Sequence, residues 1–170
     1  MVRNATIADA DAIARIYNKY VEGSVISFET EKVSGEEMRR RVCEISSSYP
    51  FLVYEQDGCV VGYCYAHQWK ERAAYSRTLE TTIYLDNAFC HQGIGRKLME
   101  ALINRCRNAG VGVLIACITG GNDQSIALHE RLGFKKVSHF YNVGCKLGSI
   151  LDVVDYELEL GGVSESDNAQ

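Results

Sequence analysis

The sequence is poor in the features that mark membrane, secreted and nucleic-acid-binding proteins. It contains no apolar run long enough to span a bilayer. Its first residues, MVRNATIADADA, lack the basic-then-apolar order of a secretory signal. The formal net charge is −4, so there is no excess of positive charge to attract nucleic acid or an acidic membrane surface. These absences predict a cytoplasmic protein without a nucleic-acid or membrane partner.

Patterns for metal binding and for disulfides are also missing. The seven cysteines are odd in number, and no C-x-x-C pair occurs among them. The four histidines are scattered and form no H-x-x-x-H pair. We therefore predict no metal site, and we expect reduced thiols that are mostly packed as small hydrophobic side chains.

The composition is that of one ordinary globular domain. The chain has 170 residues, of which 46% are hydrophobic and 24% charged. This length suffices to bury a sizeable core. We assign residues 1–160 to a single domain. The last stretch, GGVSESDNAQ at 161–170, has little to bury and is predicted to be a disordered tail.

Hydrophobic periodicity and capping residues place the elements along the chain. Thr6 with Asp9, and Ser34 with Glu37, have the spacing of capping boxes, and Asp57-Gly58 is a typical hairpin turn. The predicted elements are a strand at 2–5, a helix from Thr6, a helix at 35–47, a β-rich stretch at 51–67, a strand at 78–86, a helix at 94–109, a strand at 113–119, a helix at 125–132 and strands at 134–141 and 150–160. The resulting order, β-α-α-β-β-β-α-β-α-β-β, indicates a mixed sheet covered by helices.

The most informative stretch is CHQGIGRKLMEALINRC, a glycine loop that opens directly into an amphipathic helix. The free N–H groups of a first helical turn favour an anion, and glycines at 93 and 95 let the backbone approach a phosphate closely. Arg96 and Lys97 add positive charge. Taken alone, such a G-x-G loop can equally be a simple turn. It is not a Walker A loop, and it lacks the third glycine of a dinucleotide fingerprint.

In its context the loop resembles the pyrophosphate-binding loop Q/R-x-x-G-x-G/A of the GNAT family of acetyl-CoA-dependent N-acetyltransferases. Cys90 stands where that family usually has Gln or Arg, so one side-chain contribution is missing. The chain is more closely similar to the phosphinothricin and methionine sulfone/sulfoximine acetyltransferase branch. The matching segments are SFETE (27–31), WKERAAY (69–75), TLETTIYL (78–85), NDQSIALHERLGF (122–134) and VGCKLGSILDV (143–153). This resemblance implies an α/β (α+β) GNAT fold, a mostly antiparallel twisted sheet with helices on both faces.

Two residues are candidates for proton transfer. Glu80 is a charged side chain in an otherwise apolar strand, and alternation places Glu80, Thr82 and Tyr84 on one face. From the residues alone it can equally be a strand-end carboxylate in water, and His129 can equally be structural. The resemblance implies that Glu80 is the general base and that His129 transfers a proton at the leaving thiolate or within the same relay.

The resemblance also implies binding residues for acetyl-CoA and for the acceptor. The strand backbone of Ile83, Tyr84 and Leu85 would pair with the pantetheine arm, and Asn122, otherwise a plain N-cap, would contact it. The pyrophosphate would lie on the loop residues His91, Gln92, Gly93, Ile94, Gly95 and Arg96. The acceptor would meet Phe28, Lys70, Arg72 and Tyr75, although composition alone fits a solvated loop at 69–75.

The implied reaction is direct transfer of an acetyl group to the amine of a small amino-acid-like acceptor, without a metal. Two alternatives remain open: acetylation of a protein N-terminus, a lysine or a polyamine, and a non-catalytic acyl-CoA-binding module. Lys70 with Arg72 favours a small anionic acceptor over a peptide, and the presence of both Glu80 and His129 argues against a non-catalytic module. The resemblance further implies a homodimer.

Overall fold

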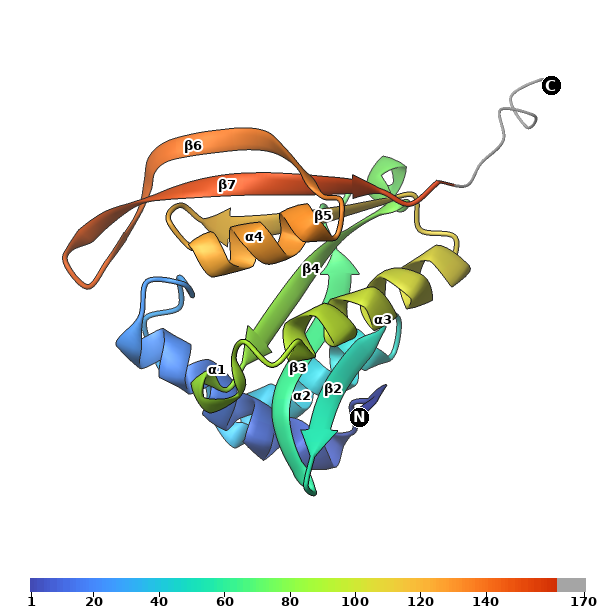
Figure 1. Cartoon of the computed structure of the whole chain (residues 1–170), viewed down its shortest axis with the longest axis vertical. Helices are drawn as coiled ribbons and strands as arrows, with labels where there is room; N and C mark the ends of the chain where they lie inside the picture. The colour runs from blue at the N-terminus through green and yellow to red at the C-terminus, as the bar shows by residue number, and fades with distance from the viewer. Residues whose placement is uncertain (162–170) are drawn as a thin grey trace.

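The computed structural model describes residues 1–161. The tail predicted for 161–170 therefore lies, Gly161 apart, outside the described residues. Within them the chain forms the predicted order of elements (Figure 1). The helices are α1 (Ala10–Gly23), α2 (Gly35–Ser46), α3 (Ile94–Asn108) and α4 (Asp123–Arg131). The strands are β1 (Val2–Asn4), β2 (Phe51–Gln56), β3 (Cys59–Gln68), β4 (Thr78–Leu85), β5 (Val113–Thr119), β6 (Lys135–Lys146) and β7 (Ser149–Glu159).

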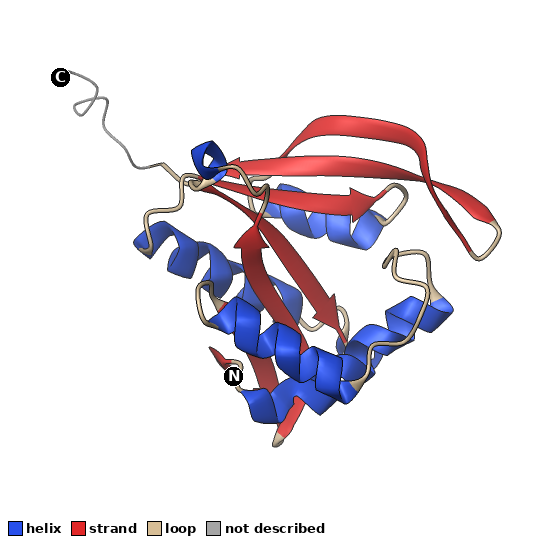
Figure 2. Cartoon of the chain, turned by 180° about the vertical axis from the view of Figure 1, so that it is seen from behind, coloured by secondary structure: helices blue, strands red, loops and turns tan. Residues whose placement is uncertain are grey.

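The strands form one sheet in the order β1-β2-β3-β4-β5-β7-β6. Every neighbouring pair is antiparallel except β4 and β5, which are parallel and are linked by α3. Helices α1 and α2 bury their apolar faces on one side of the sheet, and α3 and α4 pack on the other (Figure 2). The predicted mixed, mostly antiparallel sheet with helices on both faces is confirmed.

The helix ends follow the predicted capping residues with one difference. The Asp9 carboxylate accepts hydrogen bonds from the backbone N–H and the hydroxyl of Thr6, but residues 7–9 form a 3-10 turn and α1 begins at Ala10. Ser34 caps α2 by accepting from the Glu37 N–H at 3.1 Å. Gly110 follows the end of α3 with a positive φ of 78°, as expected for a glycine that ends a helix.

The last hairpin is longer than predicted. Strand β6 ends at Lys146 and strand β7 begins at Ser149. A two-residue turn at Leu147 and Gly148 joins them, and both turn residues have positive φ. A register shift between Phe140 and Gly144 interrupts the alternation of β6. The sequence predicted a strand that ends at residue 141, because the irregular part of β6 lacks the period-two pattern from which strands are predicted.

The cysteines are all free, but the expectation that most of them are packed is wrong. Only Cys64 and Cys106 are buried in the core. Four others are exposed and Cys90 is half-buried. The pattern misled because exposed positions on amphipathic elements also carry cysteine, such as Cys43 on α2 and Cys145 on β6.

No helix in residues 1–161 is both long enough and apolar enough to cross a membrane.

Candidate active site

The site lies where β4 and β5 separate. Strand β4 pairs with β3 from Leu79 to Leu85, but it pairs with β5 only from Thr78 to Thr81. Beyond Thr81 the two parallel strands diverge, as Figure 1 shows. The edge of β4 at residues 82–85 therefore has no strand partner on the β5 side. Because backbone N–H and C=O groups require partners, this edge can receive an extended ligand.

Two cavities open at this divergence. The smaller, of about 500 Å³, is lined by β4, β5, α4 and the loop after α1. The larger, of about 660 Å³, lies between the end of β4, the start of α3 and the face of α4. The two cavities share the lining residues Ile26, Ile83, Tyr84, Asn122 and Ser125. The shared walls allow one ligand to reach from the larger cavity to a second ligand in the smaller one.

Glu80 lines the smaller cavity and lies one residue before the end of the pairing between β4 and β5. It faces His67 across the β3–β4 ladder, and the His67 Nε2 lies 3.9 Å from its Oε1. Burial raises the pKa of the Glu80 carboxyl, the charge of His67 opposes this rise, and the charge of Asp155 adds to it. A carboxyl whose pKa is raised in a cavity is suited to accept a proton near neutral pH.

His129 lines the same cavity from α4 and is only 2% exposed. Its Nδ1 lies 2.7 Å from the Ser125 carbonyl oxygen, which can only accept, so Nδ1 carries the proton. The neutral ring consequently presents a lone pair at Nε2. Burial lowers the pKa of the His129 imidazole, which keeps this form at neutral pH. The rings of Phe134 and His129 pack nearly at right angles with their centroids 5.0 Å apart, which helps to hold the imidazole in place.

The glycine loop forms one wall of the larger cavity. His91 and Gly93 have positive φ values of 62° and 75°. A Cβ at Gly95 would lie 3.3 Å from the Leu85 side chain and 3.4 Å from the Leu128 side chain. The absence of a side chain at Gly95 therefore leaves room in the cavity at this wall. Most of the residues predicted to bind the cofactor line this cavity: Ile83, Tyr84, Leu85, His91, Gly93, Gly95, Arg96 and Asn122.

Two predicted loop residues do not line the larger cavity. The side chain of Ile94 is buried in the core beneath the sheet, and Gln92 donates to the Ala88 carbonyl at 3.4 Å. The Arg96 guanidinium lines the wall but pairs with Glu100 at 2.7 Å within α3. Cys90, at the position where the motif has Gln or Arg, has its sulfur 3.9 Å from the Asp86 carbonyl.

The predicted acceptor residues are divided. Phe28 lines the smaller cavity, and its ring lies against Gly144, where an added Cβ would be only 2.4 Å away. The other three residues, Lys70, Arg72 and Tyr75, line neither cavity. The Lys70 ammonium instead lies 4.1 Å above the Trp69 ring. Acceptor binding by these three residues stays a prediction.

Several lining residues were missed from the sequence. Ile26 and Ser125 line both cavities, Cys117 and Thr119 line the smaller, and Arg131 lines the larger. None of these residues belongs to a recognisable sequence pattern except Ser125, which stands three residues after the N-cap Asn122. The backbone N–H of Ser125 donates a hydrogen bond to the Asn122 side chain. Although Cys117 is one of the exposed cysteines, partial desolvation beside the carboxylates of Glu80 and Asp155 raises the pKa of its thiol to about 12.

Comparison with known proteins agrees with this architecture. Residues 2–154 match the family model described as the acetyltransferase (GNAT) domain. The L-methionine sulfoximine/L-methionine sulfone acetyltransferase of Salmonella typhimurium is 33% identical over 165 residues, covering 94% of both chains.

Two solved structures superpose on nearly the whole chain. A GNAT phosphinothricin acetyltransferase from Sinorhizobium meliloti, in complex with acetyl-CoA, has a TM-score of 0.92 and 34% identity, covering 98% of this chain and 94% of its own. A ribosomal-protein-alanine N-acetyltransferase from Brucella melitensis has a TM-score of 0.91 and 33% identity, and the match covers 94% of this chain and 99% of its own. The chain belongs to the GNAT family of acetyltransferases.

Proposed function

We propose that the protein transfers the acetyl group of acetyl-CoA directly to the amino group of a small amino-acid-like acceptor, with Glu80 as general base. One observation carries the proposal: Glu80, with a raised pKa, lines a cavity that shares walls with the groove at the start of α3. The acceptor class follows the relatives, which are named for methionine sulfoximine, methionine sulfone and phosphinothricin.

The groove fits acetyl-CoA. The edge of β4 at residues 82–85, which has no strand partner on the β5 side, would pair with the pantetheine arm through the groups that remain after the Tyr20 hydroxyl has donated to the Leu85 carbonyl. Positive φ at His91 and Gly93 turns the loop ahead of the first turn of α3, where the backbone N–H groups and the helix dipole suit a pyrophosphate. Arg131 adds positive charge on the cavity wall, where Arg96 is paired with Glu100. When bound, acetyl-CoA supplies the thioester carbonyl that the acceptor amine attacks.

Glu80 has the task of removing a proton from the acceptor ammonium, because only the free amine is a nucleophile. Its carboxylate is held by a strand paired on both sides, opposite His67 on β3 and Ile115 on β5. Direct transfer is favoured over an acetyl-enzyme, since the pKa of the one cysteine in the smaller cavity, Cys117, is raised to about 12. A protonated thiol is a poor nucleophile.

His129 is better suited to receive a proton than to give one. Its Nδ1–H is engaged by the Ser125 carbonyl, and Nε2 carries a lone pair. A role as resident acid would require protonation of Nε2, which the lowered pKa of the buried imidazole opposes. We therefore place His129 in a relay: Nε2 would take up the N–H proton that the amine loses as its C–N bond forms, and would pass it to the thiolate that leaves as the thioester C–S bond breaks.

The acceptor has a second candidate class, a protein N-terminus, because one similar solved structure is named a ribosomal-protein-alanine N-acetyltransferase. A cavity of about 500 Å³ is of a size that encloses a small molecule. A panel of amines separates the classes: methionine sulfone, methionine sulfoximine, phosphinothricin, polyamines and an alanine-terminated peptide. Fastest acetylation of the peptide would overturn the small-acceptor assignment, and no acetylation of any amine would leave only a binding module.

The general base is tested by Glu80→Gln, which keeps the shape and removes the proton acceptor. Turnover should fall by about 10²–10⁴-fold at pH 7 while acetyl-CoA still binds, and the loss should shrink as pH rises and more acceptor is already neutral. The matched control is Glu157→Gln, a partly buried carboxylate on β7 that lines neither cavity. Near-normal turnover of Glu80→Gln on the best acceptor would refute the assignment.

We also propose a homodimer. The β6–β7 hairpin carries a set of exposed large apolar side chains, namely Val137, Phe140, Tyr141, Val143, Leu147 and Ile150. Exposed apolar surface on an extended hairpin is suited to pairing with a second copy. Light scattering at micromolar concentration should give twice the chain mass, and a monomer mass would dismiss the proposal.

A further inference from the structure

His67 is a histidine placed directly behind the proposed base. It lies opposite Glu80 in the β3–β4 ladder, and its Nε2 is 3.9 Å from the Glu80 carboxylate. Glu80 lines the smaller cavity, whereas His67 lines neither cavity. The His67 side chain is 34% exposed. Glu80 therefore stands between the cavity and an imidazole that reaches solvent.

The hydrogen bonding of His67 fixes which nitrogen faces Glu80. Its Nδ1 lies 2.9 Å from the Gln68 carbonyl oxygen, so Nδ1 is the donor. The neutral ring then turns a lone pair at Nε2 toward a carboxylate, and two lone pairs facing each other are stabilised when one proton is shared between them. The distance of 3.9 Å is within ion-pair range and about 1 Å beyond a hydrogen bond, so a small side-chain movement closes it.

The other charged groups near the pair come from neighbouring elements. Asp155 on β7 acts on Glu80 and raises the pKa of its carboxyl, as burial does. Glu29 is already paired with Arg41 of α2 at 2.7 Å. Further titratable neighbours are Tyr65 on β3 and Cys117 on β5, and His129 of α4 lines the same cavity as Glu80. In this set His67 is the group whose positive charge favours ionised Glu80.

We propose that His67 is the relay partner of Glu80: its neutral ring takes up the proton that Glu80 removes from the acceptor and releases it to water, which returns Glu80 to its ionised form before the next turnover. The inference rests on the proposed role of Glu80. In the first step an N–H bond of the ammonium breaks and a Glu80 O–H bond forms. In the second the O–H bond breaks and the His67 Nε2–H bond forms. The imidazolium then releases the proton to water on its exposed side.

The sign of the pH effect follows from the charge. When protonated, the imidazole of His67 carries the charge that opposes the rise in the pKa of the Glu80 carboxyl. Removing its charge lets the Glu80 pKa rise further, and the acidic limb of the kcat/KM profile moves to higher pH. For a partly exposed pair the shift should be about half to one pH unit, which is about a 3–10-fold loss on the limb and little loss above it.

The experiment compares His67→Gln, His67→Ala and His139→Gln across pH 5–9, each with a melting curve. His139 is the matched control, because it forms a similar pair with Asp152 at 2.8 Å and lines neither cavity. The limb should move in both His67 variants and stay in place in His139→Gln. Added imidazole should restore turnover of His67→Ala at low pH, which a merely structural role would not allow.

The outcomes separate this inference from the proposed function. If Glu80→Gln keeps its turnover, the general base itself is wrong. If Glu80→Gln loses turnover but both His67 variants show the parental pH profile and no rescue by imidazole, Glu80 works without a relay and the inference about His67 is overturned. If His67→Ala does not fold, His67→Gln, which keeps a polar side chain of similar size, decides the question by its pH profile.

Discussion

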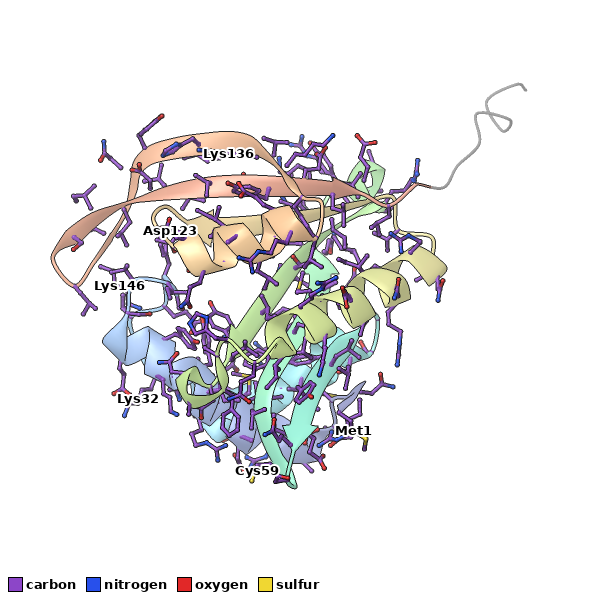
Figure 3. The ribbon with its side chains drawn as sticks, in the orientation of Figure 1. Met1, Lys32, Cys59, Asp123, Lys136 and Lys146 are labelled. Atoms are coloured by element: carbon purple, nitrogen blue, oxygen red, sulfur yellow. The ribbon has the colours of Figure 1, made fainter. Side chains whose placement is uncertain are left out.

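Lys146 fixes the loop that forms one wall of the smaller cavity. It is only 5% exposed, and its ammonium donates to the Ser27 carbonyl at 2.6 Å and to the Tyr20 carbonyl at 3.4 Å. Figure 3 shows Lys146 at the end of the β6–β7 hairpin, beside the loop that follows α1. That loop carries Ile26 and Phe28 into the cavity. We expect Lys146→Met to loosen this wall.

The magnitude follows from the two contacts. A hydrogen bond to a charged group contributes about 1.5–3 kcal/mol, and a buried carbonyl left without a donor costs about 1–3 kcal/mol. Burial opposes the charge and lowers the pKa of the Lys146 ammonium, which offsets part of the gain. Methionine retains the length and packing of the stem. The free energy of unfolding should therefore fall by about 2–3 kcal/mol, close to the cost of the short bond to Ser27.

The assay has two parts. Urea unfolding measures the loss of stability, and initial rates with varied acceptor measure KM. Because the displaced wall contacts the acceptor cavity, KM for the acceptor should rise about tenfold, the equivalent of roughly 1.4 kcal/mol. The matched control is Lys32→Met, since Lys32 is 63% exposed and pairs with Glu22 on the surface. An unchanged acceptor KM with an unchanged unfolding free energy would refute the reasoning.

The other predictions concern the two cavities. Gly95→Val should weaken acetyl-CoA binding at least tenfold by calorimetry, because its side chain would grow from a Cβ already 3.3 Å from Leu85; unchanged affinity with an intact fold would place the cofactor elsewhere. Cys117→Ala should keep turnover within about threefold, because a thiol with its pKa raised to about 12 is not a nucleophile; a 10²-fold loss, with an acetylated Cys117 detected by mass spectrometry in the parent, would favour an acetyl-enzyme.

Much of the framework was predictable because the helices and central strands obey their periods. The alternation of β4 placed Tyr84 on one face and Ile83 and Leu85 on the other. The structure confirms this, since Tyr84 packs with α1 and α2 while Ile83 and Leu85 pack against the α3 side. Such a pattern is readable because successive side chains of a strand point to opposite faces, and a slip of one residue would exchange the two sets.

The arrangement of the site was less predictable, because it depends on tertiary geometry. The register at which β5 stops pairing with β4 leaves no mark in either strand, yet it creates both cavities. The basic residues of the 69–75 segment were predicted to bind an acceptor, and the contact of Lys70 with the Trp69 ring could not be foreseen from the sequence. The partner of Glu80 was also missed, because His67 comes next to it only through the β3–β4 register.

The position of Glu80 explains how one strand can serve both ligands. Glu80 is paired on both sides, with His67 on β3 and Ile115 on β5, so its backbone is fixed in the sheet. One residue later, at Thr81, the pairing with β5 ends, and the following backbone edge is free for a ligand. A carboxylate at position 82 would point to the same face, but its strand would be paired only with β3. Glu80 is therefore the last position on this face of β4 that is paired on both sides, and the proposed base would have a fixed backbone there beside the edge proposed to bind acetyl-CoA.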